Sequence, residues 1–275
     1  MYKANFHTHS TFCDGKNTPA EIAAFAAHSG FTHLGFSGHM DADVSMDIDA
    51  YYREIRRLQQ EYLGQMDILR GIELDVLYPK DCLYGAEYCI GSTHFLDVDS
   101  PTPLSVDDTP AILQKLCREH FGDDYYALSR AYYRLEGSVY DRTGCTFVGH
   151  FDLVTRFNDE LLFLDEADPR YQKPAMEAME YLVSQGVPFE INCGAVNRNR
   201  KREYYPSNFL LRALKFFGGR IIINSDAHDM RLLTGAFEGA VRTAISCGFT
   251  HTNIIEHDSF GRVVLREIPL DQLLV

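Results

Sequence analysis

The sequence lacks long apolar runs, clustered basic residues and paired cysteines. No apolar stretch approaches the roughly 20 residues that a membrane span requires, and the amino terminus, MYKANFHTH, has no long apolar segment typical of a signal peptide. The seven cysteines are scattered and none forms a C-x-x-C pair, which indicates reduced thiols and argues against a disulfide framework or a zinc-finger set. A cytoplasmic protein with no membrane partner is therefore expected.

The charge and composition narrow the class further. A formal net charge of -13 argues against a nucleic-acid partner, because wrapping nucleic acid requires clustered lysine and arginine. With 275 residues, 45% of them hydrophobic, the chain can bury a sizeable core. No linker, repeat or low-complexity segment divides it, so residues 1–275 are predicted to form a single domain. The residues indicate no oligomeric state.

Apolar runs suited to buried strands recur along the chain. They are predicted at Lys3 to Phe6, His33 to Ser37, Asp67 to Glu73, Tyr88 to Thr93, Thr146 to Gly149, Val187 to Asn192 and Arg220 to Asn224. Helical periodicity lies between most of them, and the first helix is predicted to begin at Thr18 as N-cap, with Glu21 completing a capping box. Alternating strands and helices predict an α/β fold with a parallel sheet, and seven such units favour a distorted, closed or nearly closed (β/α)7 TIM-like barrel.

The stretch at about 97–144 breaks this alternation. It contains two predicted helices, near Pro110 to His120 and Asp124 to Glu136, and is interpreted as a helical insertion after the fourth strand. Its tyrosines, such as Tyr132 and Tyr133, could cover the site and stack on an imidazole, or could pack inside a helical hairpin, which is the favoured interpretation.

Six of the eleven histidines stand at the carboxyl ends of predicted strands, the end at which parallel α/β barrels assemble their active sites. These are His7, His9, His39, His94, His150 and His228. The carboxylates Glu73 and Asp226 occupy equivalent positions, and Asp14 follows the first strand. Taken singly, such a histidine could be solvated or hydrogen-bonded in the core, Asp14 could be a turn residue and Glu73 half of an ion pair. Their convergence on one end of one barrel favours a metal site.

The spacings have a chemical reason. Residues i and i+2 of a strand point to the same side, so His7 and His9 can face one metal together, and Asp226 with His228 repeats that relation on the last strand. The two oxygens of Glu73 could join two metals roughly 3.5 to 4 Å apart, an arrangement that activates water for attack at phosphorus.

The motifs FHTHSTFCDG, GFSGHMD, GIELD, IGSTHF, VGHFD, EIN and INSDAHD resemble those of the PHP (polymerase and histidinol phosphatase) family, and most resemble its monofunctional histidinol-phosphate phosphatases. The resemblance implies a distorted (β/α)7 barrel with three divalent metal ions, whether zinc, manganese or iron. It implies one metal held by His7, His9, Glu73 and Asp226, a second by Glu73, His94 and His150, and a third by Asp14, His39 and His228.

The resemblance also implies catalytic roles for Glu73, Asp226 and His228, and phosphate binding by Arg156 and Arg198. A bidentate guanidinium matches phosphate geometry. Arg198 lies in the charged run NRNRKR, where a solvated role is preferred for Arg202. The proton for the leaving group could come from Asp226, a metal-bound water or a histidine near the third metal.

Three functions follow as hypotheses. The favoured one is a metal-dependent phosphomonoesterase that hydrolyses the small-molecule phosphate ester L-histidinol phosphate in histidine biosynthesis. A PHP-type nuclease or nucleotide phosphoesterase is the second, and the net charge of -13 argues against it. A non-catalytic metal-binding protein is the third, disfavoured because no ligand position is missing.

Overall fold

A nine-stranded sheet forms the centre of the molecule, described by a computed structural model for residues 1–44, 46–100 and 103–273. Neighbouring strands follow chain order, all parallel except the antiparallel last pair. The strands are β1 (Ala4–Asn5), β2 (His33–Met40), β3 (Asp67–Asp75), β4 (Tyr88–Ser92), β5 (Phe147–Val148), β6 (Phe189–Asn192), β7 (Ile221–Asn224), β8 (His251–His257) and β9 (Val263–Pro269).

The sheet closes between the chain segments that follow β1 and β7. Thr8 and Ala227 form a parallel bridge there, in which the His9 amide donates to the Ala227 carbonyl at 2.9 Å and the Ala227 amide donates to the His7 carbonyl at 3.1 Å. The predicted distorted (β/α)7 barrel and its seven strands are thereby confirmed. Closure sets the residues after β1 and β7 side by side, which positions the site described below.

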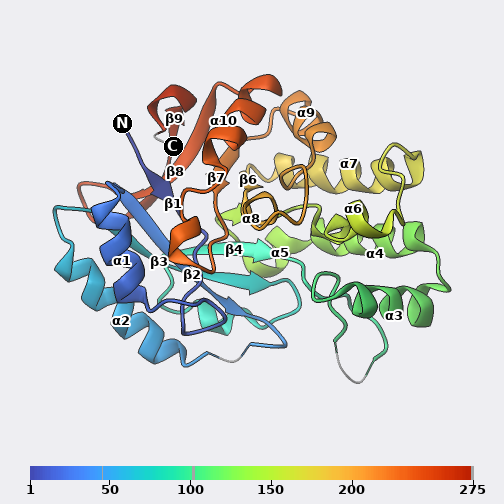
Figure 1. The fold of residues 1–275 in the computed structure, drawn as a ribbon, viewed down its shortest axis with the longest axis horizontal. Helices are drawn as coiled ribbons and strands as arrows, with labels where there is room; N and C mark the ends of the chain where they lie inside the picture. Colours follow the sequence, from blue (N-terminus) through green and yellow to red (C-terminus); the bar gives the residue numbers. More distant parts are fainter. Residues whose placement is uncertain (45, 101–102, 274–275) are drawn as a thin grey trace.

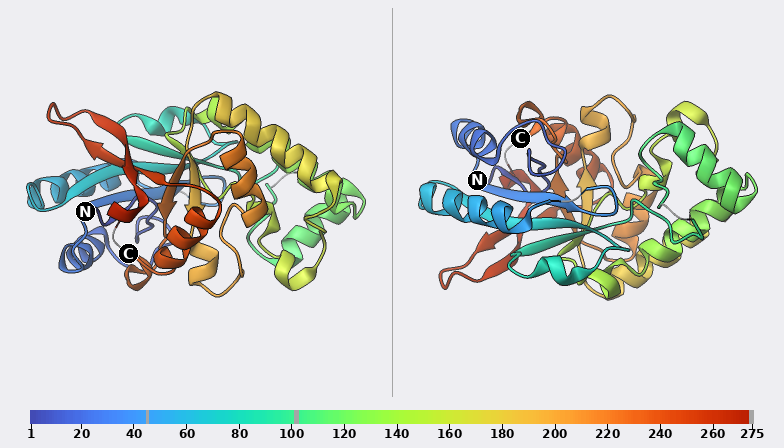
Figure 2. Two further views of the ribbon diagram at one scale, coloured as in Figure 1. Left: turned by 90° about the horizontal axis from the view of Figure 1, so that it is seen from above. Right: turned by 90° about the horizontal axis from the view of Figure 1, so that it is seen from below.

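Strands β8 and β9 were not predicted. They form a hairpin that meets β7 through the pair Ile222 and Asn253. The end of β8 reaches the start of β3, where the His257 amide and ring Nδ1 lie 2.8 and 2.7 Å from the Asp67 carboxylate. Because parallel strands start at one end of the barrel and finish at the other, the hairpin lies at the end opposite to the site. Figure 2 shows it far from helices α3 and α4.

Helices connect most of the strands, as expected for a parallel sheet (Figure 1). Within the described residues the α-helices are α1 (Pro19–His28), α2 (Ile48–Glu61), α3 (Pro110–Phe121), α4 (Tyr125–Glu136), α5 (Val139–Thr143), α6 (Asn158–Leu161), α7 (Pro169–Ser184), α8 (Gly194–Asn197), α9 (Asn208–Phe216) and α10 (Phe237–Ser246). The predicted capping box is present, with Thr18 and Glu21 each satisfying the other's backbone amide. None of these helices is both long and apolar enough to cross a membrane.

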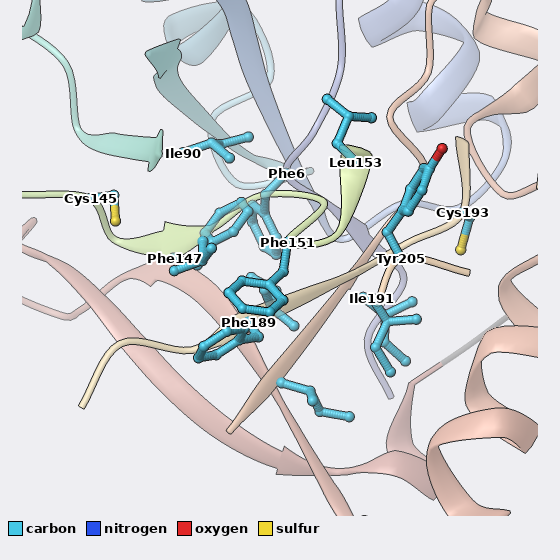
Figure 3. Packing of buried hydrophobic residues seen from close by; sticks show 14 of the residues in the cluster. Phe6, Ile90, Cys145, Phe147, Phe151, Leu153, Phe189, Ile191, Cys193 and Tyr205 are labelled. Atoms are coloured by element: carbon cyan, nitrogen blue, oxygen red, sulfur yellow. The ribbon is translucent and has the colours of Figure 1, made fainter. Parts of the chain in front are cut away.

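Aromatic side chains form a large part of the buried core. Phe6, Phe147, Phe151 and Phe189 are buried together, with the rings of Phe151 and Phe189 5.2 Å apart (Figure 3). The Tyr88 hydroxyl donates to the carbonyls of Phe6 and Phe36 at 2.7 and 2.9 Å, which ties β4 to the first two strands. Its ring needs a glycine at position 71, where a Cβ would lie 2.2 Å from the ring. This packed layer supports the polar site at the carboxyl ends of the strands.

The segment between β4 and β5 contains α3, α4 and α5, of which the first two were predicted. Tyr132 and Tyr133 on α4 are buried, and the Tyr133 hydroxyl donates to that of Tyr171 on α7 at 2.8 Å. Tyr133 therefore anchors α4 to α7, and Tyr132 anchors it to the Phe151 carbonyl at 3.2 Å, as in the favoured interpretation of a packed helical hairpin.

Candidate metal centre and substrate cavity

The nine predicted ligands come together at the carboxyl ends of the strands, around Glu73. Five ring nitrogens lie within 3.4 Å of its carboxylate: those of His7, His9 and His39 at Oε2, and those of His94 and His150 at Oε1. Ser92 also donates to Oε1 at 2.8 Å. Burial raises the pKa of Glu73, but His7 and His39 outweigh it and hold that pKa well below its usual range. An ionised carboxylate with each oxygen facing a different group of imidazoles is the geometry of a bridging ligand.

The remaining ligands lie on the side of the cluster that faces His9. His228 Nε2 is 3.0 Å from Asp14 Oδ2, and the rings of His9 and His228 stack with centroids 4.0 Å apart. Asp226 Oδ1 is 3.4 Å from His9 Nε2. Asp226 has a φ of 49°, in the left-handed region that aspartate tolerates better than most residues, and this bends the chain between β7 and His228. The bridge between Thr8 and Ala227 therefore brings together two i, i+2 pairs, one from each end of the chain.

Ligand atoms within 4.8 Å of one another define four groups that could hold a metal ion: His9, Asp14, His39 and His228; His7, His9 and Asp226; His7, Glu73 and His150; and His39, Glu73 and His94. The group of His9, Asp14, His39 and His228 contains the set expected for the third metal. The group of His7, His9 and Asp226 contains the set expected for the first metal, apart from Glu73. His94 and His150, expected together on the second metal, fall in separate groups that share Glu73.

The chemistry of this set fits cations. Burial, His228 and His39 lower the pKa of His9 to about 3, so its ring is neutral and has a lone pair to offer. Ring nitrogens of His9, His39, His94 and His150 are buried without a well-aligned hydrogen-bond partner among the described residues. Buried polar atoms of this kind normally find partners, and a bound cation would supply them.

Two carboxylates outside the predicted set orient the ligands. Glu190 Oε1 lies 2.8 Å from His7 Nδ1, and its other oxygen accepts from the His150 amide at 3.0 Å. Asp75 Oδ2 accepts from the His94 amide at 2.8 Å. The contact of Glu190 with Nδ1 holds the imidazole of His7 in one tautomer and orientation, and the two amide contacts fix the backbone at His150 and His94. Glu190 lies in the EIN motif but was not among the predicted ligands, and Asp75 was missed although it follows Glu73 by two residues.

A cavity of about 460 Å³ opens beside this cluster, and both predicted arginines line it. Arg198 donates to the Asp226 carbonyl at 3.0 Å and to its Oδ2 at 3.1 Å. Arg156 donates to Asp107 Oδ2 at 3.0 Å. Glycine at position 194 leaves room for the pair of Arg198 and Asp226, because a Cβ there would lie 2.5 Å from Asp226 Oδ2 and 2.8 Å from the guanidinium of Arg198 and would displace one of them.

Arg200 is a third arginine of the cavity wall, and sequence reasoning missed it as a site residue. Burial and the nearby guanidiniums of Arg156 and Arg198 lower the pKa of Arg200. Three converging positive charges repel one another, so this part of the cavity favours a bound anion. Arg202 is exposed, as expected for a solvated residue, and Lys201 is buried with its ammonium 2.7 Å from the Thr155 hydroxyl.

Acidic residues line another part of the cavity: Asp41, Asp43, Asp107 and Asp108. Burial, together with the neighbouring Asp41, Asp108 and Asp107, raises the pKa of Asp43, which indicates mutual repulsion that a bound cation would relieve. Asp107 and Asp108 come from the insertion. The tyrosines of that insertion are not among the residues that line this cavity.

Comparisons with known proteins find a matching family, curated relatives and solved structures of similar fold. The PHP domain family matches residues 5–194. A probable histidinol-phosphatase of Deinococcus radiodurans is 30% identical over 258 residues, covering 86% of this chain and 90% of the relative, and one of Schizosaccharomyces pombe is 25% identical, covering 97% and 94%. The crystal structure of histidinol phosphate phosphatase from Lactococcus lactis, complexed with zinc, L-histidinol and phosphate, has a TM-score of 0.72 at 21% identity, covering 92% of this chain and 97% of that one.

Proposed function

This chain belongs to the PHP domain family, and we propose that it is a metal-dependent phosphomonoesterase that hydrolyses L-histidinol phosphate to L-histidinol and phosphate in histidine biosynthesis. The observation that carries this function is the meeting of two features in one cavity. A cluster of histidines and carboxylates around Glu73 adjoins a wall formed by Arg156, Arg198 and Arg200. The first suits divalent cations and the second suits the dianion of a phosphate monoester.

Three divalent cations, whether zinc, manganese or iron, are proposed as cofactors, held by the residues expected from the sequence. His7, His9, Glu73 and Asp226 would hold the first ion, Glu73 with His94 and His150 the second, and Asp14 with His39 and His228 the third. When bound, such ions polarise phosphoryl oxygens and activate water as a nucleophile.

The chain's own residues would bind and orient the substrate. Arg156 and Arg198 are proposed to hold the phosphoryl oxygens, with Arg200 adding positive charge. Asp107 orients the guanidinium of Arg156, and Asp226 orients that of Arg198. His228 adjoins Arg198 and lies 3.4 Å from Asp226 Oδ1, and proton delivery to the departing alkoxide oxygen is proposed to use His228, with the ionised Asp226 beside it.

The two parts of the cavity wall match the two ends of this substrate. L-Histidinol phosphate has a phosphate at one end and an ammonium group and imidazole at the other. The arginines suit the phosphate, and the acidic residues Asp41, Asp43 and Asp108 suit the cationic end. Nucleotides present no ammonium group to these carboxylates. The relatives named above as histidinol-phosphatases support the same substrate.

The test is phosphate release by enzyme reconstituted separately with manganese, zinc and iron. L-Histidinol phosphate would be compared with p-nitrophenyl phosphate, nucleoside monophosphates and 3',5'-dinucleotides. A strong preference for L-histidinol phosphate is expected. Faster cleavage of nucleotides would instead identify a nucleotide phosphoesterase or nuclease.

Variants separate catalysis from simple metal binding. Glu73→Gln and His150→Ala should abolish turnover while far-UV circular dichroism shows an intact fold, because both remove groups from the centre of the cluster. His28→Ala, an exposed histidine on α1, is the matched control and should retain activity. Undiminished turnover in the first two variants would exclude this mechanism.

Two broader assignments remain proposals. The chain is proposed to be a single domain, supported by one continuous cluster of buried apolar residues, with 97–144 as an insertion. The protein is also proposed to act in the cytoplasm.

A further inference from the structure

Tyr205 is a buried residue of the cavity wall for which neither the sequence nor the chemistry described so far gives a role. It lies between β6 and α9, and its carbonyl accepts from the Asn192 amide at 2.8 Å, so its backbone is fixed to the carboxyl end of β6. Only 2% of its surface is exposed, and it is one of the residues that line the cavity together with Arg156 and Arg198. The side chain therefore belongs to the same wall as the proposed phosphate ligands.

The ring of Tyr205 is held on more than one side. The Lys201 ammonium is 5.2 Å from the ring centroid, in cation–π range, and is itself bound to the Thr155 hydroxyl. The ring of His150 is 6.5 Å away in an edge-on orientation. Figure 3 shows the hydroxyl pointing away from the phenylalanine layer formed by Phe147, Phe151 and Phe189. A ring fixed in this way keeps its hydroxyl in one place.

The hydroxyl itself has no hydrogen-bond partner among the described residues. Burial without a partner is costly, and tyrosine hydroxyls in protein interiors normally find one. Burial raises the pKa of Tyr205, the guanidinium of Arg156 lowers it, the carboxylates of Asp152 and Asp107 raise it, and Arg198 lowers it more weakly, so the hydroxyl stays protonated in a field to which both arginines contribute. A protonated phenol can donate a hydrogen bond, and the arginines that line the same cavity favour an anion there.

We propose that the Tyr205 hydroxyl donates a hydrogen bond to an oxygen of the substrate's phosphoryl group, as a third protein ligand alongside Arg156 and Arg198. This role rests on the proposed function. The arginines supply charge, whereas a phenol supplies a short, directed donor that needs no counter-charge when the cavity is vacant of substrate. A hydrogen bond to a charged acceptor is stronger than one between neutral groups.

Tyr205→Phe tests the role, because it removes one oxygen and keeps the ring on Lys201 and His150. The matched control is Tyr204→Phe, the adjacent residue, whose hydroxyl donates to the Ala236 carbonyl at 3.0 Å and does not line the cavity. Inorganic phosphate is the probe, titrated calorimetrically into each metal-loaded protein and used as a competitive inhibitor. Metal content and melting temperature would be measured on the same samples.

Phosphate should bind about 10- to 100-fold more weakly to Tyr205→Phe than to the unmodified protein, with a similar loss in kcat/KM. Inhibition by L-histidinol, which has no phosphate, and metal content should be unchanged. Tyr204→Phe should match the unmodified protein in phosphate affinity. If phosphate binds equally well to Tyr205→Phe, the hydroxyl makes no contact with the phosphoryl group and the inference fails.

Phosphate affinity also separates this inference from the proposed function. If L-histidinol phosphate is not hydrolysed but Tyr205→Phe still weakens phosphate binding, the substrate assignment fails and the phosphoryl contact stands. A second measurement keeps the hydroxyl at position 205, in case the Tyr205→Phe variant loses metal or unfolds. 3-Fluorotyrosine placed at position 205 should show a fluorine NMR shift on addition of phosphate, and an unchanged signal at saturating phosphate would overturn the contact.

Discussion

Glu136 permits a quantitative test of the environment beneath the site. It lies fully buried on α4, accepts from the Thr93 hydroxyl at 2.5 Å, and its other oxygen has no hydrogen-bond partner among the described residues. Burial raises the pKa of Glu136 to about 8, against the opposing effects of the Thr93 hydrogen bond and His94. At neutral pH the folded protein therefore holds a proton here that the unfolded chain releases.

The sign and size of the effect follow from linkage. Between pH 4.5 and about 8 the folded state binds one proton more than the unfolded state at this group, so the free energy of unfolding falls as the pH rises through that window. Moving a pKa from 4.5 to about 8 corresponds to about 5 kcal/mol, at 1.36 kcal/mol per pH unit. Local opening lets water reach the carboxyl group and makes the effect smaller than this upper bound, so we expect the free energy of unfolding to fall by about 2 to 4 kcal/mol.

Glu136→Gln removes the titration and keeps the shape of a protonated carboxyl group. Urea unfolding followed by circular dichroism at pH 5 and pH 9, at constant metal, should show nearly equal stability at pH 5 and a more stable variant at pH 9 by about 2 to 4 kcal/mol. Glu119→Gln, an exposed position on α3, is the control and should give no pH-dependent difference. A difference for Glu136→Gln that is the same at both pH values would refute the reasoning, because it would mean that Glu136 does not titrate in this range.

Three further outcomes are expected. Removing metal with a chelator should reduce phosphate release by more than about 100-fold and lower the melting temperature, because the buried imidazoles and carboxylates lose their common partner. Added manganese should restore both. Activity that survives complete metal removal, verified by elemental analysis, would contradict this. Gly194→Ala should displace Arg198 from Asp226 and lower kcat/KM about 10- to 100-fold in steady-state assays, while the metal content stays the same. A variant with normal kinetics would show that the pair of Arg198 and Asp226 is dispensable. Asp107→Asn should free Arg156 and weaken inhibition by inorganic phosphate by roughly 10-fold, whereas unchanged inhibition would mean that Arg156 needs no fixed partner.

The barrel and its ligand cluster were largely predictable because each depends on local rules. Strand-length apolar runs and the position of His39 or His150 at a strand end can be read without knowing which strands pair. Strands β8 and β9 escaped prediction because they carry no ligand and form a hairpin at the opposite end of the barrel. The capping box at Thr18 was predictable for the same local reason, since its two partners are three residues apart.

What the sequence by itself determined is the inventory: which side chains can bind cations, on which strands they stand, and which loops carry arginine. Only the tertiary structure decided how they are partnered. Barrel closure sets His9 against Asp226, the insertion delivers Asp107 to Arg156, and the loop after β6 leaves the Tyr205 hydroxyl buried and without a partner among the described residues. Spacing along one strand fixes directions over a few residues, whereas contacts between residues tens to hundreds of positions apart depend on how the whole sheet curves and closes.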